Sequence, residues 1–141
     1  MKLEKVLYTA HASATGGRDG RAETSDGQLN VKLALPTEMG GKGDGLNPEQ
    51  LFAAGWSACF IGAMSRAAKE IGVALPVDAS VAAEVDLGSD AQEGYFLQAR
   101  LNVTLPGLTH PTAQAIVDRA HQLCPYSKAT RGNISAVVTA L

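Results

Sequence analysis

The sequence predicts an α+β fold, in which antiparallel strands are covered by two main helices. Two regions, residues 3–35 and 77–105, alternate apolar and other side chains with the period of a β-strand. Two others, residues 47–72 and 109–124, carry helix-capping signals and apolar runs that suit helices. The chain has 141 residues, a length that suits one domain over residues 1–141 with a sizeable core.

The first region predicts a three-stranded antiparallel meander. Alternation over residues 3–15 indicates the first strand, and the glycine-rich turn at residues 16–20 ends it. A short strand over residues 21–25 follows, and Asp26-Gly27 is a typical hairpin turn. Alternation resumes over residues 29–35 and completes the meander.

A glycine-rich loop, residues 36–46, leads to the first long helix. The loop lacks the Gly-Lys-Ser/Thr ending of a phosphate-binding loop, so a flap over a site is the better interpretation. Asn47 is a good N-cap, and Pro48 fits the first helical turn. The helix is expected to end near Gly72. Its residues 51–64 are apolar or small on every side, which predicts burial all round.

The second half predicts a hairpin, a second helix and a last strand. Residues 77–87 and 95–105 form the hairpin, with one apolar face. Thr109 or His110 caps a helix that Pro125 stops, and residues 134–140 finish as a strand.

Charge and hydropathy exclude two classes of partner. The formal net charge is -2 and no basic run exists, which argues against nucleic acid. The longest apolar run is shorter than the ~20 residues that span a bilayer. The N-terminus carries no apolar signal core, so we expect a cytoplasmic protein with no membrane partner.

The two cysteines, Cys59 and Cys124, fall on the two helices, and both helices must cover the same sheet. Their sulfurs could therefore approach each other. Spacing alone favours inert packing, because free cysteine is often buried. The alternative is a redox pair, in which one thiolate attacks a peroxide and the other thiol condenses with the sulfenic acid. Two sulfurs and three scattered histidines make a poor zinc site.

A reactive thiolate at Cys59 would need a nearby cation, because burial raises the pKa of a thiol. The helix N-terminus lies twelve residues away, about 18 Å along the axis. The turn arginines Arg18 and Arg21 are candidates, and Glu49 could orient a guanidinium. Glu49 and Cys59 lie about 15 Å apart on one helix, however. A symmetric dimer, with Arg18 and Glu49 of one subunit facing Cys59 of the other, would satisfy the geometry.

Three long motifs resemble the organic hydroperoxide resistance (Ohr) proteins, a branch of the OsmC superfamily, over essentially the whole chain. They are Ala14-Thr15-Gly16-Gly17-Arg18-Asp19-Gly20, Asn47-Pro48-Glu49-Gln50-Leu51-Phe52-Ala53-Ala54-Gly55-Trp56-Ser57-Ala58-Cys59-Phe60, and Cys124-Pro125-Tyr126-Ser127-Lys128-Ala129-Thr130-Arg131-Gly132-Asn133.

The resemblance implies a thiol peroxidase that takes part in the oxidative stress response. Cys59 would be the peroxidatic cysteine and Cys124 the resolving one, with Arg18 as activator and Glu49 as its orienting partner. It implies an intertwined homodimer with two sites at the interface. It also implies organic hydroperoxides as substrates, no bound cofactor, and dihydrolipoamide on lipoylated proteins as the reductant of a Cys59–Cys124 disulfide.

Aromatic residues near the two cysteines could line an apolar substrate pocket. The candidates are Phe52, Trp56, Phe60 and Tyr126, although core packing also explains them. Two other functions stay open: an OsmC-like peroxidase of broader peroxide range, and a non-catalytic binder of lipids or small ligands in which both thiols are core residues.

Overall fold

The computed structural model describes residues 1–141 and confirms the α+β class. The chain forms two compact units, residues 1–48 and 49–141. Each unit is described by itself below. The single domain expected over residues 1–141 stays a prediction.

The first unit is a small antiparallel sheet with the order β1-β2-β3, which confirms the meander. Its elements are β1 (Ala12–Thr15), the 3-10 turn η1 (Gly17–Asp19), β2 (Arg21–Thr24), β3 (Asn30–Lys32) and the 3-10 turn η2 (Thr37–Met39). Ala22 of β2 pairs with Ala14 on one side and Val31 on the other. The loop after β3 returns to the sheet, because Leu33 forms a bridge with Leu46.

The first strand is shorter than the alternation predicts. Residues 3–11 adopt no strand, and β1 begins at Ala12. The physical reason is the length of the neighbouring strand, since β2 offers pairing partners only to residues 12–15. Leu7 and Tyr8 in the unpaired segment are exposed.

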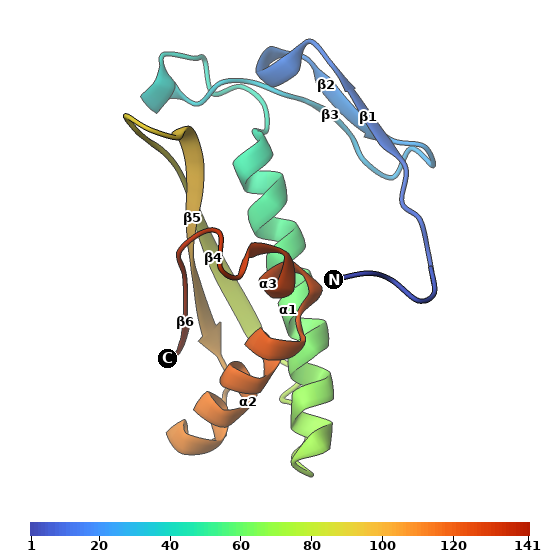
Figure 1. Cartoon of the computed structure of the whole chain (residues 1–141), viewed down its shortest axis with the longest axis vertical. Helices are drawn as coiled ribbons and strands as arrows, with labels where there is room; N and C mark the ends of the chain where they lie inside the picture. The colour runs from blue at the N-terminus through green and yellow to red at the C-terminus, as the bar shows by residue number, and fades with distance from the viewer. The chain divides into compact units, whose positions relative to one another are not determined.

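The second unit packs helices on one face of a three-stranded sheet (Figure 1). Its elements are α1 (Pro48–Glu70), β4 (Ser80–Asp90), β5 (Gly94–Thr104), α2 (His110–Leu123), α3 (Pro125–Thr130) and β6 (Ala136–Ala140). The sheet order is β4-β5-β6, with β4 and β5 antiparallel. The helix α1 begins at Pro48, where the two units join.

One expectation for the C-terminal region, that all strands are antiparallel, is wrong. The last strand, β6, pairs with β5 in parallel, because α2 and α3 carry the chain back to the start of the sheet. Pro125 ends α2 as expected, but it also begins α3, since proline fits the first turn of a helix. Thr109 is the N-cap of α2, and its side chain accepts from the Thr112 N–H.

The long helix α1 ends as predicted, and within the single chain it is buried on one side. The N–H of Val73 bonds the carbonyl of Ala68, and Gly72 takes a positive φ of 73°, which forms a Schellman ending. One side of the helix is buried, whereas Ala54 and Ala58 on the other side are exposed. Burial all round stays a prediction for a symmetric dimer, in which a second subunit would cover this side.

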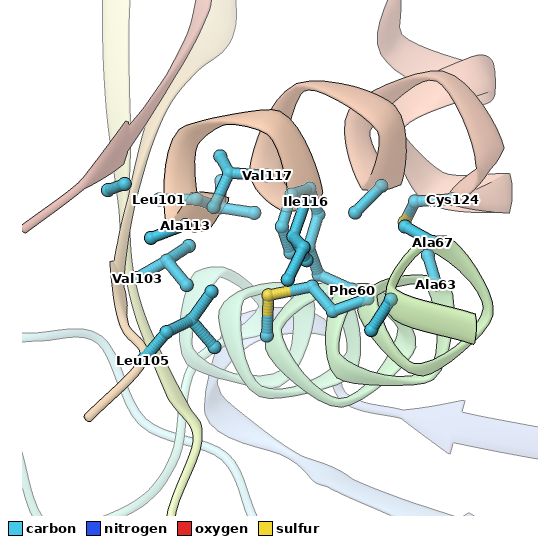
Figure 2. Close-up of a cluster of buried hydrophobic side chains, with 14 of the residues drawn as sticks. Phe60, Ala63, Ala67, Leu101, Val103, Leu105, Ala113, Ile116, Val117 and Cys124 are labelled. Carbon is cyan, nitrogen blue, oxygen red and sulfur yellow. The ribbon is translucent and has the colours of Figure 1, made fainter. Parts of the chain in front are cut away.

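The main core lies between α1, α2 and the inner face of β5 (Figure 2). Phe60 and Met64 of α1, Ile116 of α2 and Leu101 of β5 are all fully buried. This arrangement confirms that both helices cover the same sheet. It also places the end of α2, with Cys124, against the middle of α1 (Figure 2).

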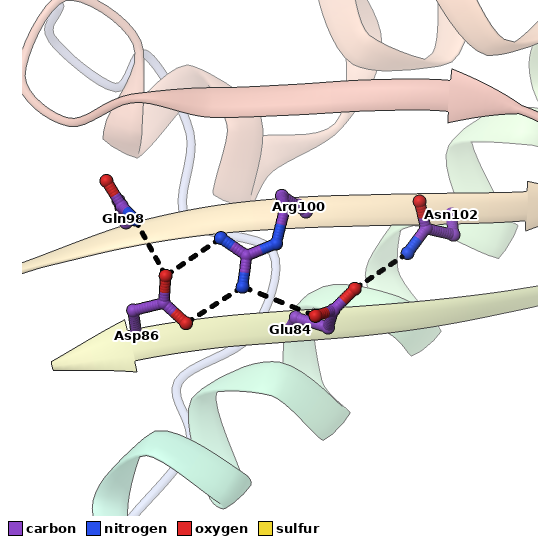
Figure 3. Close-up of polar contacts among 5 residues, drawn as sticks. All are labelled: Glu84, Asp86, Gln98, Arg100 and Asn102. Atoms are coloured by element: carbon purple, nitrogen blue, oxygen red, sulfur yellow. Dashed lines mark hydrogen bonds and ion pairs between the residues drawn. The ribbon is translucent and has the colours of Figure 1, made fainter.

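The other face of the β4–β5 hairpin carries a polar network (Figure 3). Arg100 donates two hydrogen bonds of 2.8 Å to Asp86 and one of 3.3 Å to Glu84. The side-chain amide of Gln98 donates to Asp86, and that of Asn102 donates to Glu84. The hairpin therefore has the single apolar face that its alternation predicts. None of the three helices has the length and apolar character that crossing a membrane requires.

Candidate active site

The structure brings the two cysteines together, as their places on the two helices allow. Cys59 lies in the middle of α1, and Cys124 lies at the joint between α2 and α3. Their Sγ atoms are 3.5 Å apart, and both thiols are free. Cys124 is fully buried, whereas Cys59 is half-buried. A disulfide requires an S–S separation of about 2.05 Å, so a small movement would join them.

The surroundings of Cys59 act on its acidity in both directions. Burial raises the pKa of the Cys59 thiol. The backbone N–H of Tyr126 donates to Cys59 and lowers this pKa. The Cys124 thiol raises it, because two adjacent sulfurs cannot both carry negative charge easily. Within this unit, the N–H of Tyr126 is thus a donor that favours the thiolate.

Sequence reasoning missed this donor, although a signal was present. Pro125 occupies the first position of α3 and has no N–H, so Tyr126 supplies the first N–H of that helix. A proline directly after a cysteine, at a helix start, could have suggested that the following N–H groups face the thiols. The N-terminus of α1 is too far away to do this, as predicted.

Arg18 lies in η1, a compact turn of the first unit. Gly16 and Gly17 both take positive φ values, and a Cβ on Gly20 would lie 1.6 Å from the carbonyl oxygen of Thr15. The turn therefore closes this tightly only with glycine at position 20. Asp19 accepts a 3.4 Å hydrogen bond from the Leu35 N–H, which ties η1 to the segment after β3.

Glu49 lies in the first turn of α1, in the second unit. Its carboxylate complements the positive end of the helix at that position. It lies ten residues before Cys59, about 15 Å along the same helix. A site shared by Glu49 and Cys59 would therefore need residues from two subunits. The roles predicted for Arg18 and Glu49 stay predictions.

An apolar cleft of about 480 Å³ lies within the second unit. Its lining residues come from α1, β5, α3 and the following loop: Phe52, Phe96, Leu97, Tyr126, Ala129, Thr130, Asn133 and Ile134. The rings of Phe52 and Tyr126 meet edge to face, with their centroids 6.1 Å apart. Of the four aromatic candidates, Phe52 and Tyr126 line this cleft. Trp56 and Phe60 are fully buried in the core instead.

Three hydrogen-bonded polar side chains lie beside Cys124, two of them fully buried and the third, His121, half-buried. Trp56 Nε1 donates to Ser127 Oγ at 3.2 Å, and Ser127 Oγ lies 2.9 Å from Nδ1 of His121. Ser127 is fully buried. Burial lowers the pKa of His121, and the charge of Arg131 acts in the same direction. Sequence reasoning singled out neither Ser127 nor His121, because one serine and one histidine carry no pattern.

The geometry supports thiol chemistry and offers no metal centre. No group of three or more histidine, cysteine or acidic side chains is placed to hold a metal ion. The fold and the site define an α+β protein with two adjacent free thiols, one buried and one accessible in part.

Comparison with known proteins identifies the family. The model of the OsmC-like protein family matches residues 41–139. An organic hydroperoxide resistance protein of Xanthomonas axonopodis pv. citri is 53% identical over 137 residues, which cover 96% of each chain. OhrB of Bacillus subtilis is 42% identical over 130 residues, which cover 92% of this chain and 94% of OhrB.

Solved structures agree with the sequence comparison. The organic hydroperoxide resistance protein of Legionella pneumophila has a TM-score of 0.91 and 44% identity, covering 96% of this chain and 98% of that one. The crystal structure of Bacillus subtilis OhrB gives a TM-score of 0.87. The chain belongs to the OsmC-like protein family and, within it, to the organic hydroperoxide resistance proteins.

Proposed function

We propose that this protein is a thiol peroxidase that reduces organic hydroperoxides. The observation that carries the proposal is the 3.5 Å separation of the two free sulfurs, Cys59 and Cys124. The relatives named for organic hydroperoxide resistance support the substrate class. A pair of core cysteines with no chemical role would not need to face each other across two helices.

In the first step, the Cys59 thiolate attacks the terminal oxygen of the hydroperoxide. The O–O bond breaks, Cys59 becomes a sulfenic acid, and the alkoxide leaves as an alcohol once it is protonated. The Tyr126 N–H stabilises the thiolate against the effect of burial. Arg18 supplies the positive charge that the step needs, and Glu49 orients its guanidinium. In a homodimer, Arg18 and Glu49 of one subunit would serve Cys59 of the other.

In the second step, the Cys124 sulfur attacks the sulfur of the Cys59 sulfenic acid. The S–O bond breaks, hydroxide leaves with the thiol proton as water, and a Cys59–Cys124 disulfide forms. A dihydrolipoyl dithiol, carried by a lipoylated protein, then exchanges with the disulfide and restores both thiols while it becomes oxidised. The proposed location is the cytoplasm, where thiols are kept reduced and a Cys59–Cys124 disulfide would be a transient catalytic state.

The apolar cleft suits the alkyl chain of a substrate. Phe52 and Tyr126 line it, and the backbone of Tyr126 also contacts Cys59, so the cleft adjoins the reacting sulfur. An alkyl chain gains about 0.8 kcal/mol for each methylene that it buries, which hydrogen peroxide cannot gain. The cleft therefore favours organic hydroperoxides over small polar peroxides.

The test is intact mass and free-thiol count of the reduced protein after one equivalent of cumene hydroperoxide. We expect the loss of both thiols with the loss of two hydrogens, reversed by dihydrolipoamide. Cys124→Ser should instead stop at the Cys59 sulfenic acid, which dimedone traps. Unchanged thiols would favour a non-catalytic ligand-binding protein, and equal rates with hydrogen peroxide would favour a peroxidase of broader range.

A further inference from the structure

One side chain next to Cys124, that of Ser127, hydrogen-bonds to both long helices. Ser127 lies in the first turn of α3, three residues after Cys124. Its Oγ meets Trp56 of α1 at 3.2 Å and His121 of α2 at 2.9 Å. Trp56 lies one turn before Cys59, and His121 lies one turn before Cys124. Ser127 thus connects the two turns that precede the two thiols.

We infer that Ser127, held between Trp56 and His121, is a positioning residue that keeps the Cys124 sulfur facing Cys59 for disulfide formation. The inference rests on the proposed peroxidase function, because it concerns its second step. That step needs the two sulfurs in line, and misplacement by about 1 Å can slow such a reaction about a hundredfold.

The hydrogen bonds of Ser127 assign a donor and an acceptor at each contact when His121 accepts at Nδ1. The indole of Trp56 can only donate, so Ser127 Oγ accepts from Nε1. The hydroxyl proton of Ser127 is then directed to His121 Nδ1, which accepts when the imidazole is neutral. This assignment places the imidazole proton on Nε2. A protonated imidazole would present a second donor to Ser127 and leave the hydroxyl proton without this acceptor.

Neighbouring residues also hold His121 in place. Arg131, which follows α3, donates to the backbone carbonyl of His121. The ring of Phe60 from α1 lies 6.5 Å from the imidazole, centroid to centroid. The charged groups that act on His121 are Arg131, whose charge lowers its pKa, and Asp118 on α2, whose charge raises it; burial, the largest effect, lowers it. These contacts keep His121 in the acceptor state.

The short distance between the Cys59 and Cys124 Sγ atoms is the expected result of the hydrogen bonds that Ser127 makes with Trp56 and His121. Cys124 Sγ is fully buried and cannot turn toward solvent, so its position follows that of the backbone joint. No backbone–backbone hydrogen bond links this joint to α1, whereas the N–H of Cys124 continues α2 and its carbonyl accepts from Lys128 in α3. The side-chain hydrogen bond from Trp56 therefore acts together with two contacts of Tyr126, its N–H to Cys59 and its ring to Phe52, in holding this segment against α1.

The experiment measures the two chemical steps separately. Reduced protein is mixed with one equivalent of cumene hydroperoxide and quenched over time with dimedone, and mass spectrometry counts sulfenic acid and disulfide. We expect Ser127→Ala to slow disulfide formation about tenfold or more relative to sulfenic acid formation. Trp56→Phe, which keeps an aromatic ring without the donor, should act in the same direction. If Ser127→Ala does not fold, Trp56→Phe takes its place in the experiment.

A pH series separates positioning from general stability. His121→Asn offers an amide oxygen close to the place of Nδ1 and does not titrate. The ratio of the wild-type rate of disulfide formation to that of His121→Asn should fall as the pH drops from about 8 to about 5, where imidazole becomes protonated. A ratio that stays constant would overturn the role of His121.

The matched control is Thr109→Ala, which removes a hydroxyl hydrogen bond at the far end of α2. It should leave the ratio of the two steps at the wild-type value. A Ser127→Ala protein that also keeps this ratio would overturn the inference, while wild-type disulfide formation would still support the proposed function. A wild-type protein whose thiols do not react would overturn the proposed function itself, and the inference with it.

Discussion

Gly20→Ala should distort the η1 turn that carries Arg18. We expect it to slow the first chemical step more than a substitution that lowers the free energy of unfolding by the same amount elsewhere in this unit. A Cβ at position 20 would lie 1.6 Å from the Thr15 carbonyl oxygen and 2.7 Å from the Cα of Gly16. Contacts below 3.0 Å do not occur for real Cβ atoms, so the turn must open by at least 1.4 Å. Both neighbours are backbone atoms, which cannot rotate away.

The free-energy change follows from the hydrogen bonds that this opening strains. Gly20 donates to Gly17 at 3.4 Å and accepts from the Leu33 N–H at 2.8 Å. At about 0.5–1.5 kcal/mol each, their loss lowers the free energy of unfolding by about 1–3 kcal/mol. If Arg18 activates the thiolate through charge-assisted contacts of about 1.5–3 kcal/mol, its displacement should slow the first step about tenfold to about a hundredfold.

Gly27→Ala is the matched control. Gly27 lies in the turn between β2 and β3, has a φ of 75° and has no atom within 4 Å of an added Cβ. Alanine in that conformation costs about 1–2 kcal/mol, which is similar to the loss expected at Gly20. Urea unfolding would compare stability, and free-thiol counts after cumene hydroperoxide would compare rates. Equal rates for both variants would refute the reasoning that the shape of η1 serves Arg18.

Two further predictions concern the second unit. Leu101→Ala should lower the free energy of unfolding by about 2–5 kcal/mol, because Leu101 of β5 is fully buried in the main core. Val137→Ala, at an exposed position of β6, should change the free energy of unfolding by less than about 0.5 kcal/mol in a urea titration. The hydrogen bonds from Arg100 hold the pKa of Asp86 well below its ordinary 3.8, so this carboxylate stabilises the fold above that pH and loses its effect as the pH falls. Thermal unfolding of wild type and Asp86→Asn should converge in acid; a constant gap would contradict this assignment.

Local sequence signals determined the elements of this protein well. Capping residues and turn glycines lie within the range that sets helix ends and hairpins, so Gly72 and Thr109 marked boundaries that the structure confirms. Alternation identified the β4–β5 hairpin with its apolar face. It failed for residues 3–11, because a strand also needs a partner, and alternation does not show where the partner ends.

The sequence by itself determined the α+β class, the family motifs and the two cysteines as the candidate reaction centre. Only the tertiary structure decided how close the thiols lie, that the Tyr126 N–H faces Cys59, and that Ser127 connects Trp56 with His121. The contact between Cys59 and Cys124 joins residues 65 positions apart in the chain, and that between Trp56 and Ser127 joins residues 71 positions apart. Periodicity and capping report a residue's local surroundings, whereas the direction of a buried side chain depends on how separate helices pack together.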